Sequence, residues 1–433
     1  MINPVSLNNI TRLIRPPQII HHDKHNISRS DISENALKVL YRLKNAGYKS
    51  YLVGGAVRDL LLGLKPKDFD VVTDARPEQI RELFRNCRLI GRRFRLAHVR
   101  FGTEVIEVST FRAAHHAVED VEHSNEGRLS HNNVYGDIDD DVWRRDFTVN
   151  ALFYNIENFS IIDYVGGLAD IETRQLRLIG DAAARYREDP VRMLRAVRFA
   201  VKLGFNIHPS TVQPIADHEK LLAEIPSARL FEEFMKLFMN GHALLTVKQL
   251  RSYNLFRHLF PESNELLVHE KNGTAENLLD RVFSNTDIRV AEGKPVTPAF
   301  LIAALLWFPV KQRTEEYISN GLAEHDAIQL ASDAVISRQV SSIAIPRRYT
   351  LMAREIWGLQ YRLKQRKGNR PYRLVAHPKF RAAYDFMLMR AEAGEIVHEL
   401  VDWWSEFVES HKELLSDHDN HGKSRYKRYR RKR

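Results

Sequence analysis

The chain has 433 residues, of which 44% are hydrophobic and 28% charged, a composition that excludes a disordered or fibrous protein. A chain of this length is too long to fold around one ordinary hydrophobic core, so we expect two to four structural units. The formal net charge of +10 indicates an anionic partner, and nucleic acids and nucleotides are the leading classes.

The single cysteine, Cys87, excludes an intramolecular disulfide and a cysteine-rich zinc site, and it suits a reducing compartment. The first 26 residues carry polar and basic side chains throughout, which excludes a signal peptide. No uncharged apolar run is long enough to span a bilayer. We therefore expect a soluble, cytoplasmic protein without a membrane partner.

The first part of the chain mixes strands and helices. The sequence predicts that residues 1–28 form a flexible extension and that ordered structure begins near Ser30. The elements predicted after it are a helix at 31–45, a strand at 51–53, a helix at 56–62, a strand at 69–72, a helix at 77–85, and strands at 97–101 and 105–108. This order predicts an α+β head with a small mixed sheet, and residues 113–136 predict a mobile loop.

The second part of the chain is predicted to be helical. After short strand-like segments at 160–164 and 175–179, nearly every apolar segment has the 3.6-residue period of a helix. The final residues, from Lys423 onward, read KSRYKRYRRKR, which is too charged to pack. We expect a disordered basic tail that is suited to phosphate contact.

Two acidic residues, Asp68 and Asp70, form the first candidate site. In an extended strand they share a face while Phe69 packs behind them. Neighbouring carboxylates repel each other unless a cation lies between them, and Mg²⁺ prefers carboxylate oxygens, with Mn²⁺ as the alternative ion. This pair supports a two-metal mechanism of nucleotidyl transfer; alone, such a pair is more typical of a surface turn.

A glycine pair precedes these acids. Gly54 and Gly55 lie between the strand and the next helix, where backbone N–H groups can approach a triphosphate such as that of ATP and Arg58 can add charge. The alternative is a plain tight turn in which Arg58 pairs with Asp59. The lysine-bearing P-loop pattern is absent, which argues against an ordinary kinase or ATPase.

A third carboxylate often completes such a site, and Glu107 and Asp146 both qualify. Either could instead be a salt-bridged structural acid, and the sequence does not rank them. Arg145, next to Asp146, could reach the nucleotide.

A further candidate site lies on the helix that Asp189 and Pro190 are predicted to begin. Its polar face would present an acid and three arginines at successive i+3 positions, which could bind a base: Asp189, Arg192, Arg195 and Arg198. The alternative is a solvated charged stripe.

Together these motifs resemble those of the class II nucleotidyltransferases, the group of bacterial poly(A) polymerases and tRNA CCA-adding enzymes. They occur in the family's order over residues 51–199: LVGGAVRDLLLG, KDFDVVT, RRDFTVNAL and EDPVRMLRAVRF. Other segments resemble the bacterial poly(A) polymerase I group: residues 27–43, LIGRRFRLAHV from Leu89, and HPKFRAAYD from His377.

This resemblance implies an architecture with boundaries at 29–165 (nucleotidyltransferase head), 166–270 (helical neck with base-binding and RNA-binding helices), 271–420 (helical body that binds RNA) and 421–433 (basic tail). It also implies roles for three sets of residues. The active site would contain Asp68, Asp70 and Asp146, ATP would contact Gly55, Arg58 and Arg145, and the neck helix would hold the incoming base through Asp189, Arg192, Arg195 and Arg198.

Three functions follow as hypotheses. The first is polyadenylation of RNA 3′ ends, in mRNA and small RNAs, with ATP as donor. The second is tRNA CCA addition, which uses the same head chemistry. The third is a non-catalytic RNA-binding protein of the same fold. No protein partner follows from the sequence.

Overall fold

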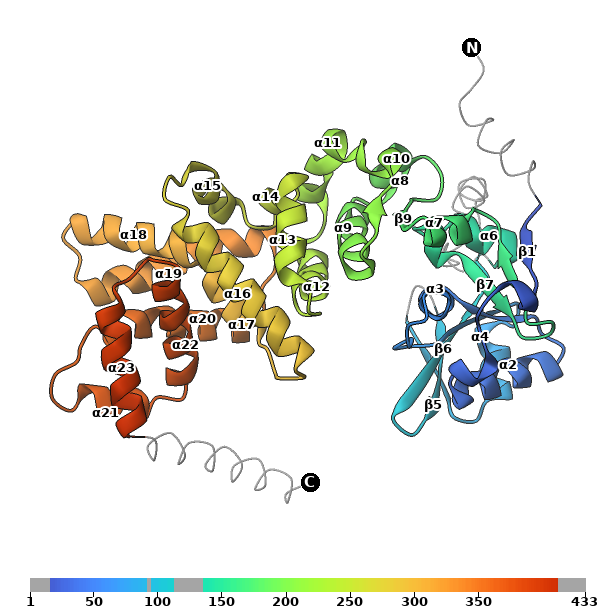
Figure 1. Ribbon diagram of the computed structural model, residues 1–433, viewed down its shortest axis with the longest axis horizontal. Helices are drawn as coiled ribbons and strands as arrows, with labels where there is room; N and C mark the ends of the chain where they lie inside the picture. The colour runs from blue at the N-terminus through green and yellow to red at the C-terminus, as the bar shows by residue number, and fades with distance from the viewer. Residues whose placement is uncertain (1–15, 92–94, 113–134, 412–433) are drawn as a thin grey trace, which may run out of the picture. The chain divides into compact units, whose positions relative to one another are not determined.

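The computed structural model describes residues 16–91, 95–112 and 135–411. The chain forms two compact units (Figure 1). The first, called the head unit below, runs to Glu188 and includes Leu203–Pro214; the second, the helical unit, comprises Asp189–Lys202 and the chain from Ile215 onward. The predicted basic tail lies outside the described residues, as does the predicted mobile loop except for its last two positions.

An eight-stranded mixed sheet forms the centre of the head unit within the described residues (Figure 1). The strand order is β1-β8-β7-β2-β3-β6-β5-β4. All neighbours are antiparallel except β3 and β6, which are parallel. The strands are β1 (Gln18–Ile20), β2 (Ser50–Val53), β3 (Asp70–Thr73), β4 (Cys87–Ile90), β5 (Leu96–Phe101), β6 (Glu104–Thr110), β7 (Leu152–Asn155) and β8 (Ile161–Asp163).

Apolar side chains pack on both faces of the central strands because helices cover the sheet there on both sides. The helix α2 (Glu34–Asn45) contacts β2, β3 and β6 and buries Val39, Leu40 and Leu43. A second apolar cluster joins Val53 and Phe153 of the sheet to Val142 of α6 (Ile138–Trp143). Packing on both faces therefore fixes the position of the central strands and of the residues at their ends.

The remaining elements of the head unit are short. The helices are α3 (Gly55–Leu61), α4 (Pro77–Leu83), α7 (Gly167–Glu172), α8 (Ala182–Glu188) and α10 (Pro209–Val212), with 3₁₀ turns η1 (His22–Lys24), η2 (Arg29–Asp31) and η3 (Thr148–Asn150). A separate parallel pair joins β9 (Gln175–Leu176) to β10 (Asn206–Ile207).

Some elements differ from the prediction. The helix predicted at 31–45 begins at Glu34, because the Ser33 hydroxyl accepts a hydrogen bond from the Ala36 N–H at 3.1 Å and caps it. Order does not begin near Ser30, since β1 pairs with β8. The strands β4 and β7 were not predicted; β7 is buried on both faces and so lacks the alternation that marks a half-buried strand.

Every regular element in the described part of the helical unit is a helix, so the predicted α+β class, a mixed head followed by a helical part, is confirmed. The helices are α9 (Val191–Leu203), α11 (Ile215–His218), η4 (Glu219–Glu224), α12 (Ser227–Phe238), α13 (Ala243–Ser252), α14 (Phe256–Leu259), α15 (Pro261–His269), α16 (Thr274–Ala291), α17 (Pro298–Leu305), α18 (Trp307–Ser319), α19 (Glu324–Ser342), α20 (Arg347–Leu363), α21 (Arg370–Val375), α22 (Phe380–Glu392) and α23 (His398–Ser410).

Buried tryptophans tie these helices together through their indole N–H groups. Trp357 of α20 donates to the Ala303 carbonyl in α17 at 2.9 Å, and Trp404 of α23 donates to the Leu363 carbonyl at 2.8 Å. Each indole is fully buried, so each bond satisfies a polar group that would otherwise be costly to bury. In the described ranges, no helix combines the length and apolar character needed to cross a bilayer.

Candidate active site

Two acidic residues lie at the start of β3. Asp70 is the first residue of the strand and Asp68 lies two positions earlier, just before the sheet. Phe69 between them is buried, whereas both carboxylates are exposed. The predicted alternation therefore holds, although the strand starts at Asp70 rather than at residue 69 and leaves Asp68 outside it.

A third acid, Glu107, lies on the neighbouring parallel strand. The register pairs Asp70 with Glu107 directly. Although Asp70 reaches the surface, protein atoms around it partly desolvate its carboxylate; this desolvation, then the charge of Glu107 and then that of Asp68, raises the pKa of Asp70 to about 6, and Arg145 opposes this effect. Asp70 is thus crowded by two other carboxylates.

These carboxylates fit a hard divalent cation. Repulsion from Glu107 and Asp68 adds to the effect of burial on the pKa of Asp70, and a cation between these carboxylates would relieve that repulsion. Oxygen donors of this kind are the ligands that Mg²⁺ prefers. Within the described ranges, no group of three His, Cys, Asp or Glu side chains lies in an arrangement that could hold a metal ion.

The glycine pair forms the expected turn between β2 and α3. Gly54 has a φ of 72°, which favours glycine. A Cβ atom at Gly54 would lie 3.5 Å from Nη1 of Arg145, and one at Gly55 would lie 3.5 Å from Nη2 of Arg58. The turn is therefore flanked by two guanidinium groups.

Arg145 is held by a buried acid that the sequence analysis missed. Its Nη2 and Nε donate to Oδ2 of Asp141 at 2.7 and 3.0 Å, and Arg144 donates to the other oxygen at 2.9 Å. Burial alone would raise the pKa of Asp141, but Arg145 and Arg144 outweigh it and hold the pKa below its ordinary value. The spacing of Asp141 and Arg145, four residues apart, is the signal that could have identified this pair.

Replacing Asp141 with asparagine is expected to lower the free energy of unfolding by about 2 kcal/mol, because Arg144 and Arg145 lose the buried carboxylate with which they pair. Ion pairs in which both partners are fully buried lose more stability when one partner is removed. The loss should be full at neutral pH and disappear as the pH falls through the lowered pKa of Asp141. Urea unfolding measures this loss of stability.

Glu78→Gln, which removes one partner of the exposed pair with Arg95, is the control and should lower the free energy of unfolding by less than about 1 kcal/mol. Equal losses in the two variants would contradict this role.

A second missed residue, Asn150, connects the predicted site residues. Its Oδ1 accepts from Nη1 of Arg58 at 2.5 Å, and its Nδ2 donates to Oδ1 of Asp146 at 3.2 Å. Its backbone carbonyl accepts from Nη1 of Arg145 at 3.4 Å. One buried asparagine thus contacts Arg58 and Asp146 through its side chain and Arg145 through its backbone carbonyl, close to the glycine turn.

Arg58 and Asp146 are both engaged in local contacts. Arg58 is buried and donates through Nε and Nη2 to Asp59 at 2.8 and 2.6 Å, so the pairing expected from a tight turn is present. Asp146 accepts from the Phe147 N–H at 2.8 Å as well as from Asn150. Glu107 rather than Asp146 is the acid that acts on Asp70, and His98 Nε2 lies 3.4 Å from a Glu107 oxygen.

The arginine-bearing helix of the helical unit is α9. Its apolar residues are buried, whereas Arg192, Arg195 and Arg198 are half-buried along one face, as their spacing predicts. Asp189 accepts from the Val191 N–H at 3.2 Å and from Arg229 at 2.6 Å. Asp189 therefore helps to begin the helix while it also pairs with α12.

Three family models match this chain. The model described as "Poly A polymerase head domain" matches residues 50–177, "Probable RNA and SrmB- binding site of polymerase A" matches 204–267, and "Polymerase A arginine-rich C-terminus" matches 320–433.

Relatives and solved structures agree with these matches. Poly(A) polymerase I of Escherichia coli O6:H1 is 51% identical over 396 residues, which cover 90% of this chain and 85% of the relative. The CCA-adding enzyme of Lactobacillus helveticus is 38% identical over 213 residues, covering 49% of this chain and 52% of the relative. The Bacillus stearothermophilus CCA-adding enzyme in complex with CTP is 25% identical, with a TM-score of 0.57 over 87% of this chain and 82% of that structure.

Proposed function

This chain belongs to the bacterial poly(A) polymerase family of nucleotidyltransferases, and from that premise we propose that it adds AMP from ATP repeatedly to RNA 3′ hydroxyls without a template. Pyrophosphate is the second product. The observation that best supports this activity is a similarity to a poly(A) polymerase I that extends over 90% of the chain.

The acids of the head unit are the proposed metal ligands. Asp68, Asp70 and Glu107 would hold Mg²⁺, or Mn²⁺, which supplies charge neutralisation for the attacking hydroxyl and the leaving pyrophosphate. Glu107 is preferred over Asp146 as the third ligand because it pairs in register with Asp70. Asp146, whose Oδ1 accepts from Asn150, is proposed as a further active-site acid beside these ligands.

The glycine turn is the proposed triphosphate site. Gly54 and Gly55 carry no side chain that would block a phosphate, and Arg145 and Arg58 lie beside them as cations. Because Asp141 and Asn150 hold these guanidinium groups in place, little ordering is required when ATP binds.

The polar face of α9 is the proposed base-binding element. A carboxylate can accept from the adenine amino group, and a guanidinium can donate to a ring nitrogen or a phosphate. The residues that would do so are Asp189, Arg192, Arg195 and Arg198.

CCA addition is the weaker alternative, because the L. helveticus CCA-adding enzyme matches only 49% of this chain. A non-catalytic RNA-binding role is weaker still, since 90% of this chain aligns with a poly(A) polymerase I at 51% identity. RNA 3′ ends, of mRNA and small RNAs, are the proposed substrates, and we place the reaction in the cytoplasm.

The decisive experiment supplies the purified protein with Mg²⁺ and either a generic labelled RNA or a tRNA that lacks its 3′ CCA, with ATP, CTP or both. We expect long ladders on the generic RNA with ATP alone. Addition restricted to the tRNA, requiring CTP and stopping after a few nucleotides, would instead establish CCA addition. Incorporation on neither RNA would leave only the non-catalytic role.

A further inference from the structure

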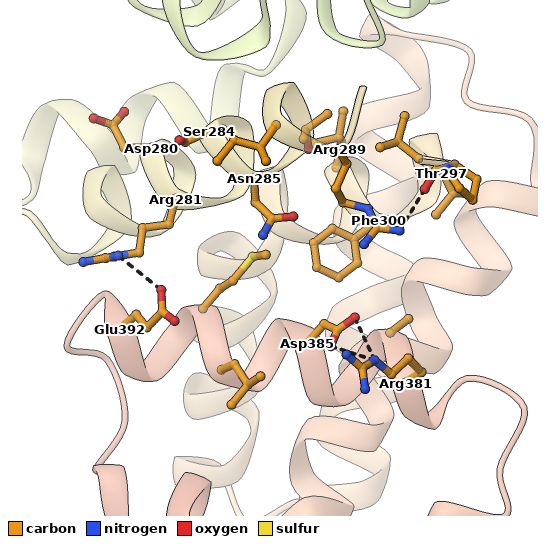
Figure 2. Close-up of a pocket in the computed structure, with 18 of the residues that line it drawn as sticks. Asp280, Arg281, Ser284, Asn285, Arg289, Thr297, Phe300, Arg381, Asp385 and Glu392 are labelled. Carbon is orange, nitrogen blue, oxygen red and sulfur yellow. Dashed lines mark hydrogen bonds and ion pairs between the residues drawn. The ribbon is translucent and has the colours of Figure 1, made fainter. Parts of the chain in front are cut away.

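A cavity of about 1040 Å³ lies in the helical unit, between α16, the start of α17 and α22 (Figure 2). None of the residues assigned above to ATP or metal binding lines it. Of its lining residues only Leu244 falls within the matched region 204–267. Its volume is in the range of cavities that hold a nucleotide-sized ligand.

An aromatic ring is part of the cavity wall. Phe300 is half-buried, and its ring packs edge-on against Phe386 behind it, with 6.0 Å between the ring centres. Met389 and Met352 also line the cavity. An aromatic ring that is fixed from behind and faces a cavity is the feature on which single-stranded nucleic acids stack their bases.

Two arginines approach the same part of the cavity. Nη2 of Arg289 donates to the Pro295 carbonyl at 3.0 Å, and Arg381 pairs with Asp385 at 3.0 Å. Burial raises the pKa of Asp385, whereas Arg381 and then Arg289 lower it in part. Both guanidinium groups therefore lie near the carboxylate of Asp385, and Lys379 adds a further cationic side chain to the lining, so this part of the cavity can receive an anion.

Amide and hydroxyl groups complete the lining. Figure 2 shows Asn285 extending from α16 into the space above α22, in the neighbourhood of Phe300 and Arg289. Ser284 and Asn277 lie on the same helix and also line the cavity. An asparagine amide can donate to and accept from the edge of a purine such as adenine.

We propose that this cavity binds one nucleotide of single-stranded RNA, with its base stacked on Phe300 within reach of Asn285 and its phosphates near Arg289 and Arg381. The proposal rests on the proposed function, since RNA is the polymer that a poly(A) polymerase handles. It adds a site that holds RNA independently of ATP and the metal. A protein partner fits less well, because arginine, lysine, asparagine and serine side chains line the cavity beside its apolar residues and its aromatic ring.

The test measures binding of a 5′-fluorescein-labelled 15-mer oligoadenylate to the full chain by anisotropy, in EDTA and without ATP. Phe300→Leu keeps an apolar side chain but removes the ring, and we expect at least about fivefold weaker binding. Arg381→Gln should weaken binding and reduce the slope of log affinity against log salt by about 0.7, the value for one lost phosphate contact on a single strand.

Matched variants of the same unit control for general effects. Phe308→Leu removes another half-buried ring, and Arg338→Gln removes another exposed arginine, one that pairs with Glu262; neither residue lines the cavity. Both should bind within twofold of the wild type. Thermal unfolding of all four variants verifies that they are folded.

Equal affinity of Phe300→Leu, Arg381→Gln and the wild type would overturn the proposal, and so would no binding by the wild type. Oligoadenylate binding that depends on the cavity residues would support it even in a protein that adds no AMP. Conversely, normal AMP addition by cavity variants that bind RNA normally would leave the proposed function intact while excluding this site.

Discussion

Replacing Asp70 with asparagine is expected to lower the rate of AMP incorporation about a thousandfold or more. The substitution keeps the size of the side chain but removes a charged oxygen from the position where Glu107 and Asp68 also contribute carboxylates. Gel analysis of labelled RNA with ATP and Mg²⁺ measures this loss. Unchanged incorporation would contradict the metal-binding assignment.

The folded state should not suffer from Asp70→Asn, because the substitution relieves repulsion among three acids. In EDTA, the temperature of unfolding is expected to equal or exceed that of the wild type. Asp23→Asn, an exposed position in the head unit, is the matched control and should retain full activity. A variant that is both inactive and markedly less stable would point to a structural role for Asp70 instead.

Replacing Asn150 with alanine is expected to lower kcat/KM for ATP about a hundredfold, because small misplacements of positioned groups have effects of this size. The variant leaves Nη1 of Arg58 without its acceptor and Asp146 without the amide donor. Steady-state kinetics with a saturating RNA primer measure the change.

Asn150→Asp separates the two contacts. This variant keeps an acceptor for Arg58 but replaces the donor to Asp146 with a second carboxylate, so a loss equal to that of Asn150→Ala would assign the effect to Asp146. Asn86→Ala removes an exposed amide that donates to the Arg100 carbonyl at 2.5 Å, and it should leave kcat/KM unchanged. If Asn150→Ala also left kcat/KM unchanged, the connecting role would be excluded.

Elements with strong local signals could be predicted from the sequence. The turn at Gly54 and the helix that begins at Pro77 each depend on residues that act within one turn of the backbone. The strand β1 could not be predicted in this way, since only its pairing with β8, more than 140 residues later, makes it a strand. Propensity says little about a three-residue segment that a distant partner stabilises.

The candidate site also combines residues that local sequence could identify with an arrangement that depends on distant parts of the chain. Asp68, Asp70 and Glu107 were identified by the chemistry of their side chains, but their grouping depends on strand pairing that no local pattern specifies. Asn150 was missed because an amide within a buried 3₁₀ turn resembles any structural asparagine until its neighbours are known. Asp141 was missed because it lies among consecutive acids that follow Ile138, and the sequence does not show that it pairs with both Arg144 and Arg145.

The parallel pairing of β3 with β6 also determines where this chain can tolerate insertions. The segment that connects the two strands contains α4, β4 and β5, and the loops between these elements can change in length without altering which residues of β3 and β6 face each other. One residue added within β6 ahead of Glu107 would turn this side chain to the opposite face of the sheet, because side chains alternate along a strand. Related chains should therefore vary in length in the loops between Thr73 and Glu104 and remain ungapped within the paired strands.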